Sequence, residues 1–291
     1  MKINQIRPLE ANFTEVLESI ALVPERLYFY GKMPDFEDFG GKRPKCVAIV
    51  GARKNTEYGE EVAYRAAYEL AKRGIVIVSG LAYGIDSTAH RAALDVGGTT
   101  VAVLGTEIDH IYPRAHEGLA RRIIENDGMI ISEYPSGEKL HFKTSFLRRN
   151  RIVSGLSDAV IVVEAASRSG TLSTAAHALE QGKEVFAVPG PITSLLSVGC
   201  NRLIKQGARP YLGFEDVLEA IAPEKLEQAK LVFGDSEEEN RIIALIGEGV
   251  RDGEEIVRRL AVSAGEFSMV ITMMEVKGYV RALGANQWVL K

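Results

Sequence analysis

The chain has few cysteines and no long apolar run, and these absences exclude several classes of protein. Only two of its 291 residues are cysteines, and Cys46 and Cys200 stand far apart. They form neither a disulfide framework nor the spacing of a metal site, so we expect no metal. No segment has the roughly 18 apolar residues that cross a bilayer, and the first residues lack the apolar core of a signal peptide. We therefore expect a protein of the reducing cytoplasm.

An excess of positive charge is also absent. The chain has 35 Lys and Arg against 39 Asp and Glu, a net charge of −4. This excludes a coat of cations of the histone kind, so any contact with nucleic acid has to come from a local patch. Residues 143–151 form such a patch, with four cations, no anion and the ring of Phe146. Cations for phosphate and a ring for base stacking suit a single-stranded nucleic acid, although a solvated charged turn has the same composition.

Short apolar runs in the middle of the chain predict a parallel sheet. Their β-branched residues do not alternate with polar ones, which is typical of strands buried on both faces. The runs cover residues 46–50, 75–79, 100–104, 129–132, 159–163 and 184–188. Helical segments at 60–72, 86–96 and 171–181 lie between them. The predicted fold class is therefore α/β, with a doubly wound, mostly parallel sheet.

The composition divides the chain into four segments. Residues 1–43 are predicted to be a lead-in with a short helix and a Pro/Gly-rich stretch, and residues 44–222 to be the α/β domain. A charged linker at 223–236 leads to residues 237–291. There, three helical segments and a hairpin around Gly284 predict a small winged-helix-like domain. Ser263 and Glu266 are expected to form a capping box at the start of the third helix.

Glycines follow several predicted strands, at positions 51, 80, 105 and 190. This edge of an open α/β sheet is where ligands bind. The first turn lacks the GxGxxG spacing, so a dinucleotide cofactor is disfavoured. Arg53 occupies that turn instead, where it can bind a phosphate through two hydrogen bonds or pair with a nearby carboxylate.

Two further turns have features of a binding site. Gly80 and Gly84 allow a ligand to approach the backbone, and Asp86 is predicted to be the N-cap of the next helix. After the fifth strand, residues 169–171 open another helix with Arg168 beside them. Their amides and hydroxyls can bind one anion, or serve only as a helix cap.

Taken together, these motifs resemble the DNA-processing protein A family (DprA, also called Smf). The shared segments fall within residues 44–221 in the family's order. They include Val-Ala-Ile-Val-Gly-Ala-Arg, Ser-Gly-Leu-Ala-Tyr-Gly-Ile-Asp, Phe-Leu-Arg-Arg-Asn-Arg, Ser-Arg-Ser-Gly-Thr and Val-Pro-Gly-Pro. The resemblance implies an extended Rossmann fold that binds single-stranded DNA without a nucleotide cofactor and without catalysis. It also implies protection of incoming strands in natural transformation, loading of a RecA-type recombinase, and a homodimer.

The resemblance also assigns residues to the DNA. The family's Gly-Ser-Arg loop falls on residues 51–53, where Ala52 replaces the serine and removes one hydroxyl. Lys143 would meet phosphate and Phe146 would stack on a base. Arg149 and Arg151 are candidates too, with the alternative role of bracing the pocket through internal ion pairs. The full set of expected DNA-binding residues is Gly51, Arg53, Gly80, Gly84, Lys143, Phe146, Arg149, Arg151, Arg168, Ser169, Gly170 and Thr171.

Two other functions fit parts of the sequence. The Ser-Gly-Thr helix start resembles the nucleotide pocket of the lysine-decarboxylase-like phosphoribohydrolases. However, Ser167 and Arg168 replace that family's glycines, and the next carboxylate is Glu180. The tail could instead belong to a transcription regulator that reads duplex DNA. Residues 236–291 hold seven Lys and Arg against nine Asp and Glu, which favours a contact with protein or a role in a dimer over base recognition.

Overall fold

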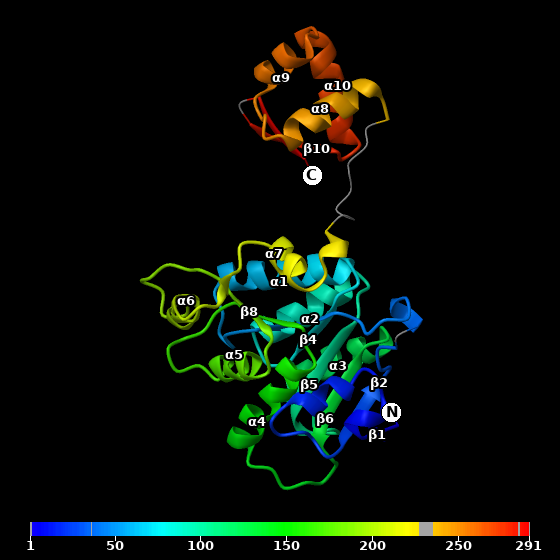
Figure 1. The fold of residues 1–291 in the computed structure, drawn as a ribbon, viewed down its shortest axis with the longest axis vertical. Helices are drawn as coiled ribbons and strands as arrows, with labels where there is room; N and C mark the ends of the chain where they lie inside the picture. The colour runs from blue at the N-terminus through cyan, green and yellow to red at the C-terminus, as the bar shows by residue number, and fades with distance from the viewer. Residues whose placement is uncertain (1, 36, 227–234, 285, 291) are drawn as a thin grey trace. The chain divides into compact units, whose positions relative to one another are not determined.

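The computed structural model describes residues 2–35, 37–226, 235–284 and 286–290, except for the side chains of Phe142 and Lys143. The chain divides into two compact units, Met1–Leu226 and Glu227–Lys291 (Figure 1). Nine strands of the described chain form one sheet in the larger unit, in the order β1-β2-β6-β5-β4-β3-β7-β8-β9. The seven strands from β3 to β9 run parallel, whereas β1 and β2 join antiparallel beside β6. The predicted fold class is confirmed.

The six predicted strands are all present. The parallel strands are β3 (Cys46–Val50), β4 (Val76–Ser79), β5 (Thr100–Glu107), β6 (Met129–Tyr134), β7 (Ala159–Val162), β8 (Glu184–Ala187) and the short β9 (Arg209–Pro210). Because β5 is longer than predicted, Gly105 lies inside the strand and not after its end. That position proves important for the site.

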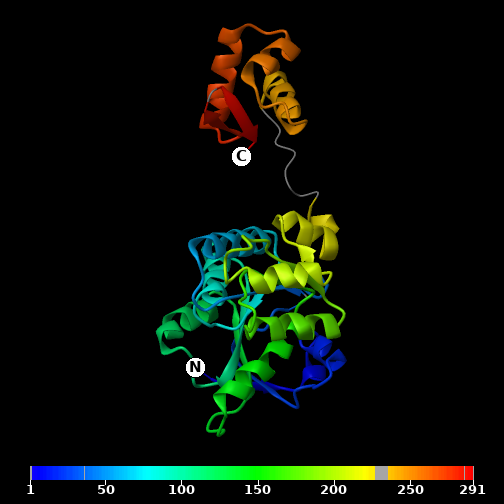
Figure 2. The same ribbon diagram turned by 90° about the vertical axis from the view of Figure 1, so that its left-hand side faces the viewer.

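Helices cover both faces of the sheet (Figure 2). Along β3, Ala48 faces the core shared with α4, α5 and α6, whereas Val47 and Ile49 face the core shared with α1, α2 and α7. The three predicted helices correspond to α1, α2 and α5, and four others were not predicted. The seven are α1 (Glu57–Lys72), α2 (Ile85–Asp95), α3 (Glu117–Glu125), α4 (Phe142–Gly155), α5 (Thr171–Glu180), α6 (Val198–Lys205) and α7 (Phe214–Ile221).

The N-terminal segment differs from the prediction. It contributes β1 (Asn4–Ile6) and β2 (Leu27–Gly31) to the sheet, and β2 pairs antiparallel with β6. Two short 3-10 turns, Pro8–Glu10 and Glu15–Ser19, replace the expected helix. Phe13 and Leu17 are fully buried there against the core of the main sheet. The prediction was wrong because the partner of β2 lies about a hundred residues away in the sequence, where local patterns carry no information about it.

The strand order reverses beside β3. The strands β4, β5 and β6 follow one another on one side of β3, and β7, β8 and β9 follow on the other. The carboxyl ends of β3 and β7 therefore form the switch point of the sheet. In open α/β sheets the loops at such a point line the ligand site.

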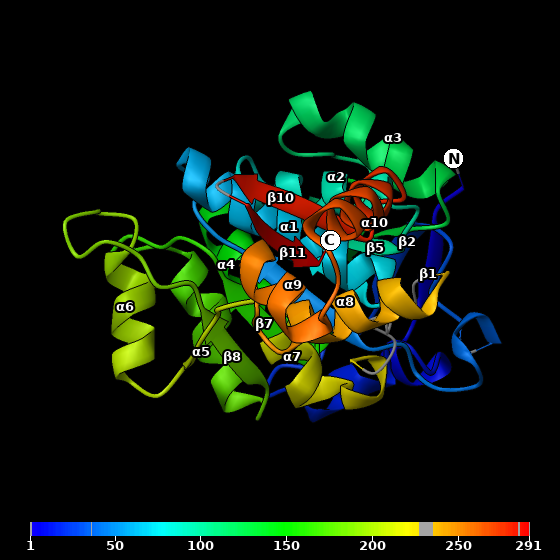
Figure 3. The same cartoon turned by 90° about the horizontal axis from the view of Figure 1, so that it is seen from above.

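The smaller unit has the predicted order of helices and hairpin. Its elements are α8 (Glu237–Gly247), α9 (Gly253–Leu260), α10 (Ala264–Val276), β10 (Val280–Gly284) and β11 (Gln287–Leu290) (Figure 3). The capping box is confirmed, because the Glu266 amide donates to Ser263 Oγ at 3.2 Å and the Ser263 amide donates to Glu266 Oε2 at 2.9 Å. Of the expected linker, residues 227–234 lie outside the described residues. Among the described helices, none is both long and apolar enough to cross a membrane.

Candidate nucleic-acid interface

A pocket of about 220 Å³ opens at the switch point of the sheet. The loops that follow β3, β4 and β7 form its walls, and one side of α4 forms the rest. Eight of the residues predicted from the sequence line it together: Gly51, Arg53, Gly80, Phe146, Arg149, Ser169, Gly170 and Thr171.

The basic stretch at 143–151 lies within α4, so the alternative of a charged turn was wrong. Successive helical residues are about 100° apart, which sends Arg149 and Arg151 toward opposite sides. Arg149 lines the pocket, whereas Arg151 contacts Glu133 on β6. Lys143 lies in the first turn of α4, and its side chain is outside the described residues. Within the basic cluster, Arg149 therefore faces the pocket and Arg151 faces away from it.

Arg149 is buried and fixes the loop after β4. Its Nη1 atom donates to the carbonyl of Gly80 at 2.8 Å and also to the carbonyl of Val103. Burial lowers the pKa of Arg149 to about 10, and the nearby Asp86 opposes that shift, so the guanidinium stays charged at neutral pH. A Cβ atom on Gly80 would lie 2.4 Å from Arg149 Nη2. The glycine is therefore required for this close approach.

Asp86 is not the N-cap of α2, which corrects the prediction. Gly84 occupies that position with a φ of 76°, and Asp86 lies in the first turn behind it. The carboxylate accepts a hydrogen bond of 3.1 Å from the amide of Gly80. Burial raises the pKa of Asp86, while the charge of Arg149 acts in the opposite direction. Asp86 and Arg149 thus hold the same glycine from two sides.

Arg53 is the exposed cation of the pocket. No carboxylate of the described residues forms an ion pair with it, so the alternative of a paired arginine is not realised. Its guanidinium carbon lies 5.6 Å from the centre of the Phe146 ring. The loop that carries Arg53 is anchored by Glu164, which accepts hydrogen bonds from the Thr56 amide at 3.0 Å and the Thr56 hydroxyl at 2.5 Å.

Phe146 packs directly against the backbone of β5. A Cβ atom on Gly105 would lie 2.4 Å from Phe146 Cδ1, so only glycine leaves room for the ring. Tyr112 lies on another side of Phe146, with ring centres 5.5 Å apart and the planes tilted by 46°. The sequence indicated the importance of Phe146 but not the role of Gly105.

Some of the hydrogen-bond donors at the start of α5 are already paired with atoms of the protein. The hydroxyl of Thr171 donates to the carbonyl of Gly51 at 3.1 Å, and the amide of Thr171 donates to Ser169 Oγ at 3.2 Å. Asn150, which was not predicted, donates to Ser173 Oγ at 2.8 Å and joins α4 to α5. Of two donors that were expected to meet an anion, the Thr171 hydroxyl thus joins two loops of the pocket, and the Thr171 amide is used within its own turn.

Three predicted residues do not line the pocket. Arg151 is 3% exposed and donates to Glu133 Oε1 at 2.5 Å, which is the bracing alternative. Arg168 is exposed outside the lining. Gly84 is a packing residue, because a Cβ atom there would lie 2.3 Å from the carbonyl oxygen of Ala52.

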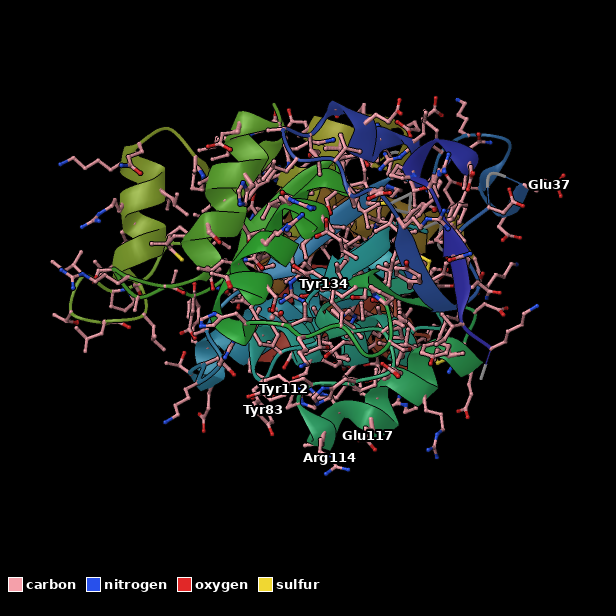
Figure 4. All side chains as sticks on the ribbon, turned by 90° about the horizontal axis from the view of Figure 1, so that it is seen from below. Glu37, Tyr83, Tyr112, Arg114, Glu117 and Tyr134 are labelled. Carbon is pink, nitrogen blue, oxygen red and sulfur yellow. The ribbon has the colours of Figure 1, made fainter. Side chains whose placement is uncertain are left out.

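Two tyrosines at the rim of the site were missed. Tyr83 follows β4 and Tyr112 follows β5, and Figure 4 shows both side chains at the same end of the domain. Both line a second, smaller hollow beside the pocket. The only available signal was an aromatic residue in each loop at the carboxyl edge of the sheet.

Comparison with known proteins finds matches along most of the chain. The model of a family described as DNA recombination-mediator protein A matches residues 4–222, and a DprA winged helix domain matches residues 219–286. Protein Smf of Escherichia coli is 50% identical over 175 residues, which is 60% of this chain and 46% of that protein. The DNA processing protein DprA of Streptococcus pneumoniae is 44% identical over 202 residues, covering 69% of this chain and 68% of that protein.

Solved structures show the same similarity. The X-ray structure of DprA from Streptococcus pneumoniae has a TM-score of 0.66 and 38% identity, and covers 76% of this chain and 75% of that one. The structure of DNA processing protein A from Helicobacter pylori, reported for its single-stranded DNA binding mode, has a TM-score of 0.64 and 31% identity, over 75% and 95% of the two chains. The chain spans about half the length of several curated relatives, including 46% of Protein Smf.

Proposed function

The chain belongs to the DNA recombination-mediator protein A family, and on that premise we propose that it binds single-stranded DNA at the pocket beside β3. One observation carries the proposal. An exposed cation, Arg53, lies over the ring of Phe146 in a pocket at the switch point of the sheet. Such a pair can neutralise a phosphate and stack on the adjoining base, and the ring does not discriminate between bases.

The expected binding is tolerant of sequence and sensitive to salt. Stacking contributes about 1–3 kcal/mol for each base. Each phosphate that the protein neutralises adds a slope of about −0.7 in a plot of log affinity against log salt concentration. Arg168, which lies outside the pocket lining, and Lys143 are proposed as further phosphate contacts. Gly170 and Ser169 are proposed to approach the DNA backbone from the start of α5.

The pocket chemistry favours binding over hydrolysis. Asp86 is the one carboxylate among the described residues that line it. That group accepts the amide proton of Gly80 and lies buried beside Arg149. A phosphoribohydrolase needs an accessible acid at the substrate, which is a different arrangement.

The family also supports a wider role. We propose that the protein protects incoming single strands, helps load a RecA-type recombinase, and acts as a homodimer. The winged-helix unit is proposed to contact protein in preference to duplex DNA.

Fluorescence anisotropy tests the proposal. The full chain is titrated into labelled oligo-thymidine and mixed-sequence strands of equal length, and into the matching duplex, at several salt concentrations. We expect tight binding of both single strands, weakening steeply as salt increases. A parallel incubation with nucleoside monophosphates should release no free base. Equal affinity for the duplex, or release of base, would contradict the proposal.

A further inference from the structure

A second hollow lies next to the pocket and has an aromatic rim. It is lined by Arg53, Gly80, Ala82, Tyr83, Tyr112, Pro113, Phe146 and Arg149, and its volume is about 30 Å³. The hollow is far smaller than the pocket, and a ligand that reaches it would contact its rim.

The rim consists of two half-exposed tyrosine side chains. Tyr83 is 49% exposed and Tyr112 is 42% exposed. Tyr83 packs edge-on against His116, with ring centres 4.9 Å apart and the planes at 65°. His116 is itself buried, and its Nδ1 atom donates to the carbonyl of Leu81 at 2.8 Å. Tyr83 therefore lies against a side chain that is fixed to the same loop.

Tyr112 extends the aromatic surface that begins at Phe146. The two rings lie 5.5 Å apart at 46°, so their faces are not parallel and Tyr112 presents its own surface to solvent. Tyr83 and Tyr112 line the same hollow, and Figure 4 shows both side chains at the outer edge of the domain. An exposed aromatic pair beside a cation is a stacking platform for nucleic-acid bases.

Arg53 lines both hollows. Its guanidinium carbon lies 5.6 Å from the centre of the Phe146 ring, and the centre of the Tyr112 ring lies 5.5 Å from that same ring centre. In a single strand, each phosphate joins two nucleotides. A cation that lines both hollows fits such a phosphate, with one nucleotide at the Phe146 pocket and the next at the tyrosines.

We propose that the bound strand continues from the pocket past Arg53, and that its next base stacks on Tyr112 and Tyr83. This inference rests on the proposed function, because it extends the same DNA path by one subsite. The two tyrosines are then specificity determinants for the length of strand that is bound, and not for its sequence.

Oligonucleotide length separates the two subsites. Tyr83→Ala and Tyr112→Ala are compared with Tyr83→Phe and Tyr112→Phe, using thymidine 5′-monophosphate and oligo-thymidines of up to twenty nucleotides. We expect each Ala variant to lose about 5- to 150-fold in affinity for the oligonucleotides. The loss should disappear for the mononucleotide, which fills only the Phe146 pocket. The Phe variants keep the ring and should bind like the unchanged protein.

Two controls make the test specific. Tyr64 on α1 is also exposed and stacks on Tyr68, outside both hollows, so Tyr64→Ala should leave DNA binding unchanged. Irradiation with oligonucleotides that contain 5-iodouracil, followed by peptide mass spectrometry, should give adducts at Tyr83 or Tyr112. Thermal melting of each variant identifies any general loss of folding.

The failure of this inference differs from the failure of the proposed function. If the unchanged protein binds no single strand, or Phe146→Ala has no effect, the proposed function is wrong. If Phe146→Ala weakens binding at all lengths while both tyrosine variants bind long strands normally, the second subsite is overturned. Equal losses for the mononucleotide and the oligonucleotides in the tyrosine variants would overturn it as well.

Discussion

The Nη1 atom of Arg149 donates a hydrogen bond of 2.8 Å to the carbonyl of Gly80, which lies 69 positions earlier in the chain. The bond joins the helix that carries the basic cluster to the loop after β4. Asp86 holds the amide of the same glycine at 3.1 Å. A cation that the sequence indicated as a DNA contact therefore also sets the shape of the pocket floor.

Replacing Arg149 with Ala is expected to destabilise the larger unit by about 3–5 kcal/mol, because it leaves the buried Asp86 without its nearby cation. Urea unfolding followed by circular dichroism measures the change. Arg148→Ala is the matched control, since Arg148 is 54% exposed in its side chain and its partner Glu133 keeps a closer ion pair with Arg151. We expect a change below about 1 kcal/mol for the control. Equal effects of the two substitutions would contradict the bracing role.

Replacing Arg53 with Ala is expected to weaken binding to every single-stranded sequence, since the lost contact is to phosphate. The slope of log affinity against log salt should become shallower by about 0.7. Anisotropy titrations at four salt concentrations give the slope. Lys54→Ala, which removes the adjacent exposed charge outside the pocket lining, should change the slope less. An unchanged slope for Arg53→Ala would remove Arg53 from the site.

Gly105→Ala is expected to displace the ring of Phe146, because the added Cβ would lie 2.4 Å from it. Overpacking of this kind costs about 1–3 kcal/mol in stability, and single-stranded DNA binding should weaken as well. Gly118→Ala in α3 is the control, because no heavy atom lies within 4 Å of its added Cβ. That substitution should stabilise the helix by about 0.5–1 kcal/mol. Normal DNA binding by Gly105→Ala would show that the position of Phe146 is unimportant.

Because of His90, we expect the free energy of unfolding to fall at mildly acidic pH. It is fully buried, its Nδ1 atom lies 2.7 Å from Thr100 Oγ1, and burial lowers its pKa to about 3. Between pH 6.5 and about 3, the His90 side chain is protonated in the unfolded chain and stays neutral in the folded chain. The free energy of unfolding should therefore fall as pH falls from 6.5 toward 3, at up to about 1.4 kcal/mol per pH unit from this group.

Urea unfolding at pH 7, 6 and 5 measures that slope. His90→Gln should flatten it, whatever its effect on stability at pH 7. The range above pH 5 is chosen because most carboxylates titrate below it. An identical slope in His90→Gln would exclude this histidine as its source.

Much of the larger unit could be predicted from the sequence because its central strands are buried on both faces. A strand that is buried on both faces, such as residues 46–50, is a continuous apolar run that can be recognised within a few residues of sequence. The glycines that follow such strands mark the edge where ligands bind. Gly51 and Arg53 were found from that edge without a structure, whereas Phe146 was indicated by the basic cluster around it and by the family resemblance.

What could not be predicted depended on contacts between distant segments. The strand β2 is stabilised by pairing with β6, and nothing in its own five residues specifies that partner. Gly105 lies within β5, and the approach of Phe146 from α4, which no local pattern reveals, explains why a side chain is missing there. The directions of Arg149 and Arg151 became clear only once residues 142–155 were seen to form a helix.

The antiparallel strand β2 also determines how the protein can be shortened. A fragment that begins at Pro44 would retain the whole pocket but would lose the strand that pairs with β6 from Met129 to Ser132. The backbone amides and carbonyls along that side of β6 would then face solvent, in a strand whose residues are almost all buried. Such an uncovered edge is a template for pairing with another chain. Fragments for DNA-binding work should therefore keep the first 43 residues, although none of the described residues among them (2–35 and 37–43) lines the pocket.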